Sequence, residues 1–449
     1  MAELDSRPGE APVVVEPRRL AGGPDESVSQ PRWSPDGRLH WVSDRTGWWN
    51  LYADDGDDGQ PLAPRSAEFG GPDWVFGQSS YVFLPDGRLV AVWCADGVDH
   101  LGVLGPGAGE TAEVPTSLTR VGALQPRPAG VAAIAASAID PTSVVEIGLD
   151  GHAEFVRRSR EAGLDPAFVS RPQPLAFPTS GGGSAHAFWY PPTNPDHHGP
   201  RGQRPPLVVL SHGGPTSSAS PAFNLAVQFW TTRGLGVVDV DYRGSTGYGR
   251  EYRRALDGRW GVADVDDCVA AAVHLVEQGA VDSRLLAIRG GSAGGYTTLC
   301  ALTFRDVFAA GASLYGVADM GRLARDTHKF ESRYLDRLVG PWPEAADVYR
   351  ERSPLHHAER LSCPVIILQG LEDRVVPPAQ AEVMVAALRA KGLPFAHVTF
   401  PGEQHGFRRA ETIRAAAEAE LSFYGQVLGF QPAGDIAPVT VENLPPHGS

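Results

Sequence analysis

The sequence has few cysteines and no long apolar run. Only four of its 449 residues are cysteines, and they lie far apart in apolar segments, at Cys94, Cys268, Cys300 and Cys363. No two of them have the spacing of a metal site, so we expect buried free thiols and no bound metal. The chain has no run of eighteen apolar residues, and its start, MAELDSRPGEAP, lacks the apolar core of a signal peptide. We therefore expect a cytoplasmic, soluble protein without a membrane partner.

Positive charge is also scarce. The chain carries 39 lysines and arginines against 53 aspartates and glutamates, which gives a net charge of −14. This balance argues against a broad surface for nucleic acid or for an anionic membrane, because both would repel it. We expect small neutral or cationic partners, and no organic cofactor.

The first 170 or so residues contain short alternating segments and turn dipeptides with almost no helical periodicity, a pattern typical of all-β structure. The segments WSPDGRLHWVS, from Trp33, and YVFLPDGRLVAVW, from Tyr81, share the turn Pro-Asp-Gly-Arg, and a weaker copy covers residues 130–151. A repeat of roughly 40 to 50 residues with several short strands predicts the blades of a β-propeller. A β-sandwich with two similar hairpins is the alternative.

The pattern changes after a proline- and glycine-rich loop at residues 190–206. Apolar runs such as PLVVLS, GVVDVD, LLAIRGG and CPVIILQG then alternate with helical stretches such as DVDDCVAAAVHLVEQG. Strands that alternate with helices predict an α/β fold, with a mostly parallel sheet covered by helices on both faces. The last 19 residues contain four prolines and no periodic pattern, so we expect a loose tail.

One turn carries a candidate nucleophile. In LLAIRGGSAGGYTTLCAL, Ser292 stands between an apolar strand and a helical stretch, and glycines lie two positions away on either side, at Gly290 and Gly294. Side chains at those two positions would collide across so sharp a turn, which explains the glycines. The pattern is that of the G-x-S-x-G nucleophile elbow of α/β-hydrolases. A glycine-rich turn with an incidental serine is the alternative.

A serine hydroxyl needs a base, and the base needs an acid to orient it. In α/β-hydrolases these follow the serine in the order Asp, His, each after a strand. Asp373 follows the strand in VIILQGLEDRVVPP, and His405 follows the next one in VTFPGEQHGF. Glu372 is the rival acid. His212, in SHGGP, is better placed to hold a loop by hydrogen bonds, and four further histidines read as surface residues: His197, His198, His356 and His357.

Acyl transfer also needs hydrogen-bond donors for the oxyanion of the tetrahedral intermediate. The backbone N–H of Ala293, at the start of the helix after the elbow, is one candidate. The other is a tyrosine in DYRGSTGYGREY, where the sequence alone does not choose among Tyr242, Tyr248 and Tyr252.

Together the motifs SHGGP, DYRGSTGYG, GGSAGG, GLEDRVVP and EQHGF resemble the prolyl oligopeptidase family of serine peptidases, in that family's order. Its acylaminoacyl-peptidase-like and dipeptidyl-peptidase-like bacterial members are the most similar, and WSPDGRL with VSDRTGWWNLY extends the likeness into the β part. The resemblance implies that Ser292 is the nucleophile, His405 the base and Asp373 its orienting acid. It also implies that Tyr248 donates to the oxyanion beside Ala293, under a covering propeller.

These inferences divide the chain into four parts: an N-terminal extension (1–20), a partial β-propeller of about three blades (21–170), an α/β-hydrolase catalytic domain (171–430) and a loose tail (431–449). Propellers of this family have seven or eight blades. With only about three, end blades would face solvent, so we expect a homo-oligomer formed through the β part or a truncated version of a longer protein.

The substrate pocket departs from the family pattern. Some relatives carry a basic residue two positions after the catalytic aspartate, where this chain has Val375, with Arg374 one position earlier. Val375 and Val376 would suit the wall of an apolar pocket for the P1 side chain, with Tyr252 and Tyr315 beside them. Core packing is the alternative for each.

The leading functional hypothesis is a serine peptidase that cleaves short peptides, of aminopeptidase, acylaminoacyl-peptidase or dipeptidyl-peptidase type. One alternative is a small-molecule carboxylesterase that uses the same three residues. The other is a poorly active fragment whose β part serves as a binding module.

Overall fold

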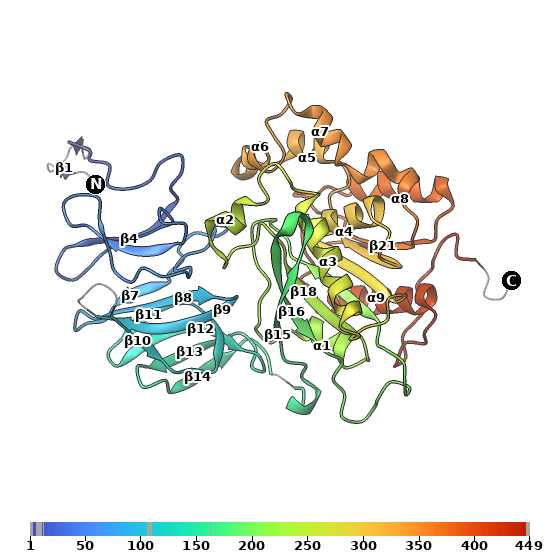
Figure 1. Cartoon of the computed structure of the whole chain (residues 1–449), viewed down its shortest axis with the longest axis horizontal. Helices are drawn as coiled ribbons and strands as arrows, with labels where there is room; N and C mark the ends of the chain where they lie inside the picture. The colour runs from blue at the N-terminus through green and yellow to red at the C-terminus, as the bar shows by residue number, and fades with distance from the viewer. Residues whose placement is uncertain (1–2, 6–10, 12, 106–109, 162, 446–449) are drawn as a thin grey trace. The chain divides into compact units, whose positions relative to one another are not determined.

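The computed structural model describes residues 3–5, 11, 13–105, 110–161 and 163–445 (Figure 1). Parts of the predicted N-terminal extension and residues 446–449 of the predicted tail lie outside the described residues. The chain forms two compact units. The β unit comprises Met1–Ala162, Ser220–Phe223 and Thr246–Glu251, and the α/β unit comprises the rest.

The β unit contains three four-stranded antiparallel sheets, each built from strands that follow one another in the sequence. The first consists of β3 (Val28–Trp33), β4 (Leu39–Ser43), β5 (Asn50–Ala53) and β6 (Gln60–Pro61). The second consists of β7 (Tyr81–Phe83), β8 (Leu89–Ala95), β9 (Val98–Leu104) and β10 (Thr111–Val114), and the third of β11 (Leu118–Arg127), β12 (Gly130–Ser137), β13 (Ser143–Gly148) and β14 (Ala153–Arg158). A short hairpin, β1 (Glu3–Asp5) with β2 (Val13–Val15), precedes them.

The repeated Pro-Asp-Gly-Arg segment forms the same turn twice. It connects β3 to β4 and β7 to β8, and its glycines, Gly37 and Gly87, have φ angles of 82° and 87°. Glycine adopts this left-handed backbone without the strain that a side chain would bring. Two apolar clusters lie between the sheets, one of them around Leu101 and Val90 and the other around Trp49 and Leu51.

The α/β unit is built on one eight-stranded sheet in the order β15-β16-β18-β17-β19-β20-β21-β22. The antiparallel strands β15 (Gln173–Pro178) and β16 (Ser184–Tyr190) lie at one side, and β16 pairs with β18 (Gly236–Asp241). The remaining pairs are parallel, through β17 (Leu207–Ser211), β19 (Leu286–Gly291), β20 (Ala310–Leu314), β21 (Val365–Gly370) and β22 (Phe395–Phe400). These parallel strands read as continuous apolar runs because both of their faces are buried.

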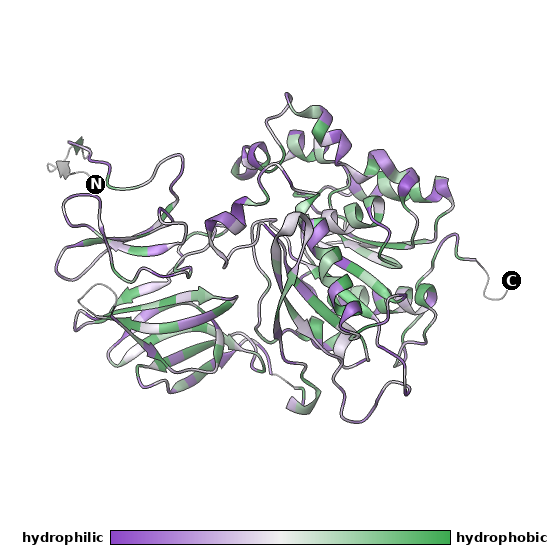
Figure 2. Cartoon of the chain, viewed as in Figure 1, coloured by the Kyte–Doolittle hydropathy of each residue, from purple (hydrophilic) through white to green (hydrophobic). Residues whose placement is uncertain are grey.

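Helices cover both faces of this sheet (Figure 1). Side chains of α3 (Ala263–Glu277), α4 (Ala293–Phe304) and α8 (Ala379–Lys391) pack in one apolar cluster, while those of α1 (Leu225–Thr231) and α9 (Ala410–Leu428) pack in the other. The shorter helices are α2 (Gly249–Arg254), α5 (Met320–Asp326), α6 (Tyr334–Leu338) and α7 (Ala346–Glu351), with 3-10 turns η1 (Pro166–Phe168), η2 (Ser180–Gly182), η3 (Lys329–Glu331) and η4 (Pro354–Arg360). Figure 2 shows apolar residues concentrated on the central strands. No helix among the described residues is long and apolar enough to span a bilayer.

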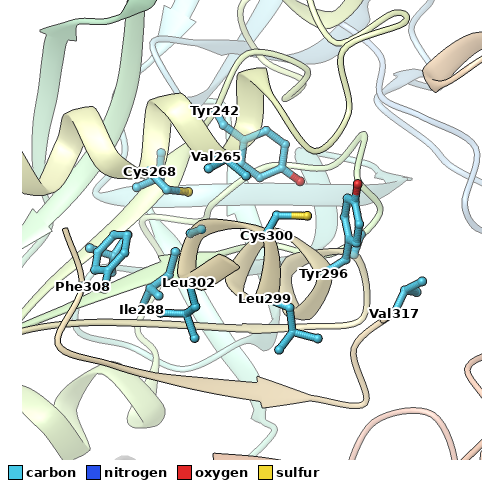
Figure 3. Close-up of a cluster of buried hydrophobic side chains, with 14 of the residues drawn as sticks. Tyr242, Val265, Cys268, Ile288, Tyr296, Leu299, Cys300, Leu302, Phe308 and Val317 are labelled. Atoms are coloured by element: carbon cyan, nitrogen blue, oxygen red, sulfur yellow. The ribbon is translucent and has the colours of Figure 1, made fainter. Parts of the chain in front are cut away.

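The cluster beneath α4 supports the serine turn. Figure 3 shows Leu299, Cys300 and Leu302 of α4 packed with Cys268 of α3 and Ile288 of β19. All four cysteines are free, and burial raises the pKa of the Cys268 and Cys300 thiols well above the ordinary value. These thiols are therefore protonated, inert parts of the core.

The described part of the C-terminal tail corrects one expectation, because it is not loose. Glu442 pairs with Phe395 of the edge strand β22 through two backbone hydrogen bonds, of 3.0 and 2.7 Å, and its carboxylate binds Arg389 of α8 at 2.8 Å. Upstream, the N–H of Val439 donates to the Ser422 hydroxyl of α9 at 2.9 Å. Proline excludes this segment from helices, but the segment satisfies its backbone groups against the sheet edge and α9 instead.

Candidate active site

Ser292 stands at the end of β19, immediately before α4, with φ 56° and ψ −120°. This backbone conformation is strained for any residue except glycine. A Cβ atom at Gly290 would lie 2.3 Å from the backbone of Gly294, and one at Gly294 would lie 2.1 Å from the carbonyl oxygen of Ser211. The glycines are therefore required by the close passage of the chain, as the elbow pattern predicts.

The structure places Ser292, His405 and Asp373 in one hydrogen-bonded line. His405 Nε2 lies 2.9 Å from Ser292 Oγ, and His405 Nδ1 lies 2.8 Å from Asp373 Oδ2. The three residues follow β19, β21 and β22, whose parallel arrangement brings their carboxyl ends to the same edge of the sheet. This arrangement lets the imidazole accept the serine proton while the carboxylate orients the ring.

Asp373 accepts hydrogen bonds from several donors. Its side chain is fully buried, and Oδ1 accepts the N–H groups of Val375 and Val376 at 2.8 and 2.9 Å. Gln369 of β21 reaches Oδ2 with its amide at 3.5 Å. The rival acid Glu372 is exposed, and its backbone N–H donates to Glu403 O at 2.9 Å.

Glu403 holds the turn around His405 by hydrogen bonds, a role that the sequence analysis did not identify. It is 2% exposed, and its carboxylate accepts the N–H groups of Arg408 and Arg409 at 3.0 Å each, across the turn that carries His405. Burial acts to raise the pKa of Glu403, but the hydrogen bonds from Arg409 and Arg408 outweigh it and lower the pKa. In the sequence, its position two residues before His405, in EQHGF, could have indicated this role.

The other histidine near the elbow is not arranged as a base for Ser292. His212 Nε2 contacts the Ser245 hydroxyl at 2.7 Å, and Nδ1 contacts the Gly213 carbonyl at 2.8 Å. Burial lowers the pKa of His212 to about 4. The neutral His212 therefore holds its loop by hydrogen bonds, as its motif predicts.

Among the described residues, no group of three or more His, Cys, Asp or Glu side chains could hold a metal ion.

A small pocket, partly open to solvent, adjoins the serine. Ser292, Ala293, Val375 and Val376 line it, together with side chains that the sequence reading did not include: Trp260, Val317, Leu323, Thr327, Glu331, Tyr334 and Leu335. The walls are mainly apolar. Because the pocket begins at the nucleophile, it is suited to the side chain of the residue whose carbonyl is attacked.

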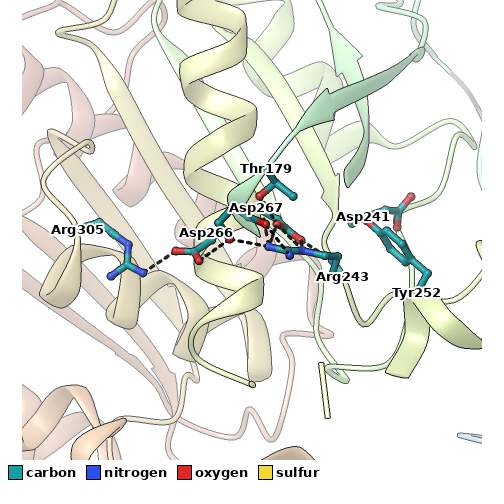
Figure 4. Close-up of polar contacts among 8 residues, drawn as sticks. Thr179, Asp241, Arg243, Tyr252, Asp266, Asp267 and Arg305 are labelled. Atoms are coloured by element: carbon teal, nitrogen blue, oxygen red, sulfur yellow. Dashed lines mark hydrogen bonds and ion pairs between the residues drawn. The ribbon is translucent and has the colours of Figure 1, made fainter. Parts of the chain in front are cut away.

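Three residues expected in this pocket lie elsewhere. Tyr252 donates its hydroxyl to the Asp241 carbonyl at 2.6 Å, beside the polar cluster of Figure 4. Arg374 is exposed. Tyr315, with φ 40°, packs its ring edge against His405 at 5.0 Å between centroids. Residue order alone does not show which neighbour this ring contacts.

The candidate oxyanion donors have different settings. Ala293 is buried at the first position of α4, where the helix dipole favours negative charge. Tyr242 donates its hydroxyl to the Pro215 carbonyl at 2.9 Å, so that hydroxyl is engaged in the core. Tyr248 lies in the segment Thr246–Glu251, which belongs to the β unit, and its role as a donor stays a prediction.

Residues 221–431, which contain the elbow, Asp373 and His405, match the sequence model of the Prolyl oligopeptidase family. These residues belong to the prolyl oligopeptidase family. The family resemblance read from the motifs is thereby confirmed.

Relatives in the family align mainly with this half of the chain. The chain is 36% identical over 230 residues to dipeptidyl aminopeptidase BIII of Pseudoxanthomonas mexicana. The aligned region covers 50% of this chain and 33% of the relative. The chain is also 30% identical over 219 residues to an acylamino-acid-releasing enzyme of Arabidopsis thaliana. This alignment covers 47% of this chain and 29% of the relative.

Solved structures extend the likeness to nearly the whole chain. A puromycin-hydrolysing peptidase of Mycobacterium tuberculosis matches 96% of this chain and 66% of its own, with a TM-score of 0.92 and 44% identity. A puromycin hydrolase matches with a TM-score of 0.90 and 43% identity, over 95% of this chain and 65% of its own. The chain thus spans about a third of these curated relatives and just under two thirds of the solved chains. The fold class, an α/β-hydrolase domain preceded by a propeller-like β domain, is confirmed.

Proposed function

We propose that this chain is a serine peptidase that hydrolyses short peptides through an acyl-enzyme. The observation that carries the proposal is the continuous line of hydrogen bonds from Ser292 through His405 to Asp373. The family membership of residues 221–431 supports it.

In the proposed mechanism, Ser292 Oγ attacks the substrate carbonyl while its proton moves to His405 Nε2. Asp373 keeps the other ring nitrogen protonated and stabilises the imidazolium. The N–H of Ala293 and the hydroxyl of Tyr248 donate hydrogen bonds to the oxyanion. His405 then protonates the leaving amine, and water, activated by the same imidazole, releases the acyl group from Ser292.

In this proposal the apolar pocket binds the side chain of the P1 residue. Val375 and Val376 form part of its wall, and the same two residues hold Asp373 through their backbone N–H groups. A change in this segment would therefore affect both specificity and catalysis. We further propose a cytoplasmic location, a homo-oligomer formed through the β part, and catalytic and propeller domains with the boundaries expected from the sequence.

A panel of chromogenic substrates tests the proposal. We expect cleavage of p-nitroanilides with free, N-acetylated or proline-containing peptide groups, at rates that fall to background in the Ser292→Ala variant. A p-nitrophenyl ester serves as the comparison. Hydrolysis of the ester without cleavage of any peptide would contradict the peptidase proposal and favour a carboxylesterase.

A further inference from the structure

The small pocket beside Ser292 has one acidic side chain in its apolar wall. Glu331 lines this pocket together with apolar side chains such as Trp260 and Leu323, and all the lining residues belong to the α/β unit. Among the described residues that line the pocket, Glu331 alone carries a charge. Its side chain is 22% exposed, so water screens this charge less than at an open surface.

The carboxylate of Glu331 has few partners of its own. Thr327, which also lines the pocket, donates its hydroxyl to Glu331 Oε2 at 3.2 Å. His328 Nε2 lies 3.8 Å from the same oxygen and is positively charged only when protonated. In the part of the chain that the structure describes, no lysine or arginine pairs with Glu331. An ionised carboxylate has about four acceptor positions, so this one can still bind a cation from a substrate.

The segment that carries Glu331 is fixed to the rest of the α/β unit. The Tyr334 hydroxyl accepts the N–H of Thr216 at 3.1 Å and lies 2.6 Å from the Thr216 hydroxyl. Burial raises the pKa of Tyr334 to about 12, and the negative charge of Glu331 adds to the rise. Arg337 of α6 binds Asp257 at 2.7 Å. The acid therefore belongs to a fixed wall of the pocket.

This wall suits a group with an apolar stem and a positively charged end. Methylene groups can pack on Leu323 and Leu335 while the charged end pairs with the carboxylate. The net charge of −14 also favours the approach of cationic substrates. We propose that Glu331 is a specificity residue of the P1 pocket, which selects substrates that carry a positively charged group on the P1 residue. The inference rests on the proposed peptidase function.

Two groups on a P1 residue supply such a charge, the side chain of lysine and a free α-amine. Short peptide p-nitroanilides that differ only at P1 test both in the full chain. Lysine is compared with norleucine, which has the same four-carbon stem without the ammonium group. Each is supplied as the free amino acid, the N-acetylated amino acid and the glycyl dipeptide. In the series that the wild type cleaves, we expect kcat/KM to be roughly tenfold higher for lysine.

Glu331→Gln removes the charge and keeps an oxygen that can accept the Thr327 hydroxyl. We expect it to reduce the lysine preference to about twofold or less, by lowering kcat/KM for lysine and leaving that for norleucine nearly unchanged. Both substrates are measured on one enzyme sample, so a misfolded fraction does not alter their ratio. Asp336→Asn is the matched control, because Asp336 pairs with Arg333 at 3.2 Å and does not line the pocket. This variant should keep the full preference.

Each outcome decides for or against the subsite. No lysine preference in the wild type, or one that Glu331→Gln leaves intact, would overturn the proposal and leave Ser292 in its proposed role. Equal losses for lysine and norleucine would also overturn it, because the acid would then support the pocket without recognising charge. If free norleucine is preferred over acetylated norleucine and Glu331→Gln abolishes that preference, the subsite is upheld with the α-amine as its ligand. If the wild type hydrolyses only the p-nitrophenyl ester, the proposed function itself fails and the inference falls with it.

Discussion

The two units of this chain use β-strands in different ways. In the β unit each sheet joins four consecutive strands, so its pairings are local in the sequence. In the α/β unit the strand order is 15-16-18-17-19-20-21-22, and the parallel pairs need helical connections between them. Local pairing leaves a repeat in the sequence, whereas the parallel sheet brings distant segments to one edge.

The candidate chemistry follows this difference. Ser292, Asp373 and His405 all belong to the α/β unit, where three strand ends meet. The β unit contributes the segment Thr246–Glu251, which leaves the parallel sheet after β18 and joins the other unit. The comparison therefore predicts that the α/β unit holds the reacting groups.

The largest effect is expected at Ser292. Replacement by alanine removes the only proposed nucleophile, and kcat should fall by roughly 10⁶-fold, as in other serine peptidases. Thermal unfolding should be unchanged, because alanine has the same strained backbone. Ser292→Gly should be equally inactive but more stable by about 1 kcal/mol, since glycine accepts φ 56° without strain. Retention of a tenth of the wild-type rate by either variant would remove Ser292 from its role.

A cavity in the β unit tests whether the two units separate stability from chemistry. Leu101 of β9 is fully buried, and its replacement by alanine should lower the free energy of unfolding by about 3 kcal/mol. The rate at which a fluorophosphonate probe labels Ser292 should stay within twofold under native conditions, because the hydrogen-bonded line lies in the other unit. Denaturant unfolding and labelling kinetics give the two readings. If the labelling rate also fell, stability and chemistry would not be separated between the two units.

Tyr248 is expected to be an exception to the division of roles between the two units. Tyr248→Phe should lower kcat by about 10²-fold, or about 2.7 kcal/mol, although the residue belongs to the β unit. Tyr242→Phe and Tyr252→Phe are the controls. Their hydroxyls donate to backbone carbonyls of the α/β unit, so their loss should cost roughly 1 kcal/mol of stability and little kcat. Similar kcat values for all three variants would exclude a tyrosine donor.

A pH-dependent effect is expected at the start of α3. Burial raises the pKa of Asp264 to about 6, against the lowering effect of hydrogen bonds from Thr297 and from the N–H of Gly261. The folded protein therefore binds this proton more tightly than the unfolded chain. Its stabilising effect is complete below about pH 4 and is lost as the pH rises towards about 6, by at most about 1.4 kcal/mol per pH unit.

Asp264→Asn lacks this titration, so its stability relative to the wild type should increase between pH 4 and 6. Urea unfolding of both proteins at several pH values measures the difference. A constant difference across that range would show that Asp264 is ionised throughout.

The sequence predicted the parallel strands and the elbow well, for a physical reason. Strands buried on both faces are continuous apolar runs, and the turn after β19 needs glycine at Gly290 and Gly294. The placement of His405 and Asp373 after successive strands could likewise be read in one dimension. All these signals are local.

The parts that the sequence missed depend on side-chain direction. Tyr315 was expected in the P1 pocket, but its ring packs on His405 and its backbone has a φ of 40°. Leu323 and Leu335 line the pocket from helices α5 and α6, which lie far from Ser292 in the sequence. Neither a backbone dihedral angle nor a contact across such a distance has a signal in residue order.

The C-terminal segment has a consequence for handling the protein. β22 is the last strand of the eight-stranded sheet, and the bridge between Phe395 and Glu442 covers part of its free edge. An uncovered edge strand is a template for intermolecular pairing. Shortening the chain at residue 430 would expose this edge and would also remove Ile436 and Val439, which pack against the apolar cluster of α1 and α9. Such a shortened chain should aggregate during purification even though every residue of the hydrogen-bonded line is still present.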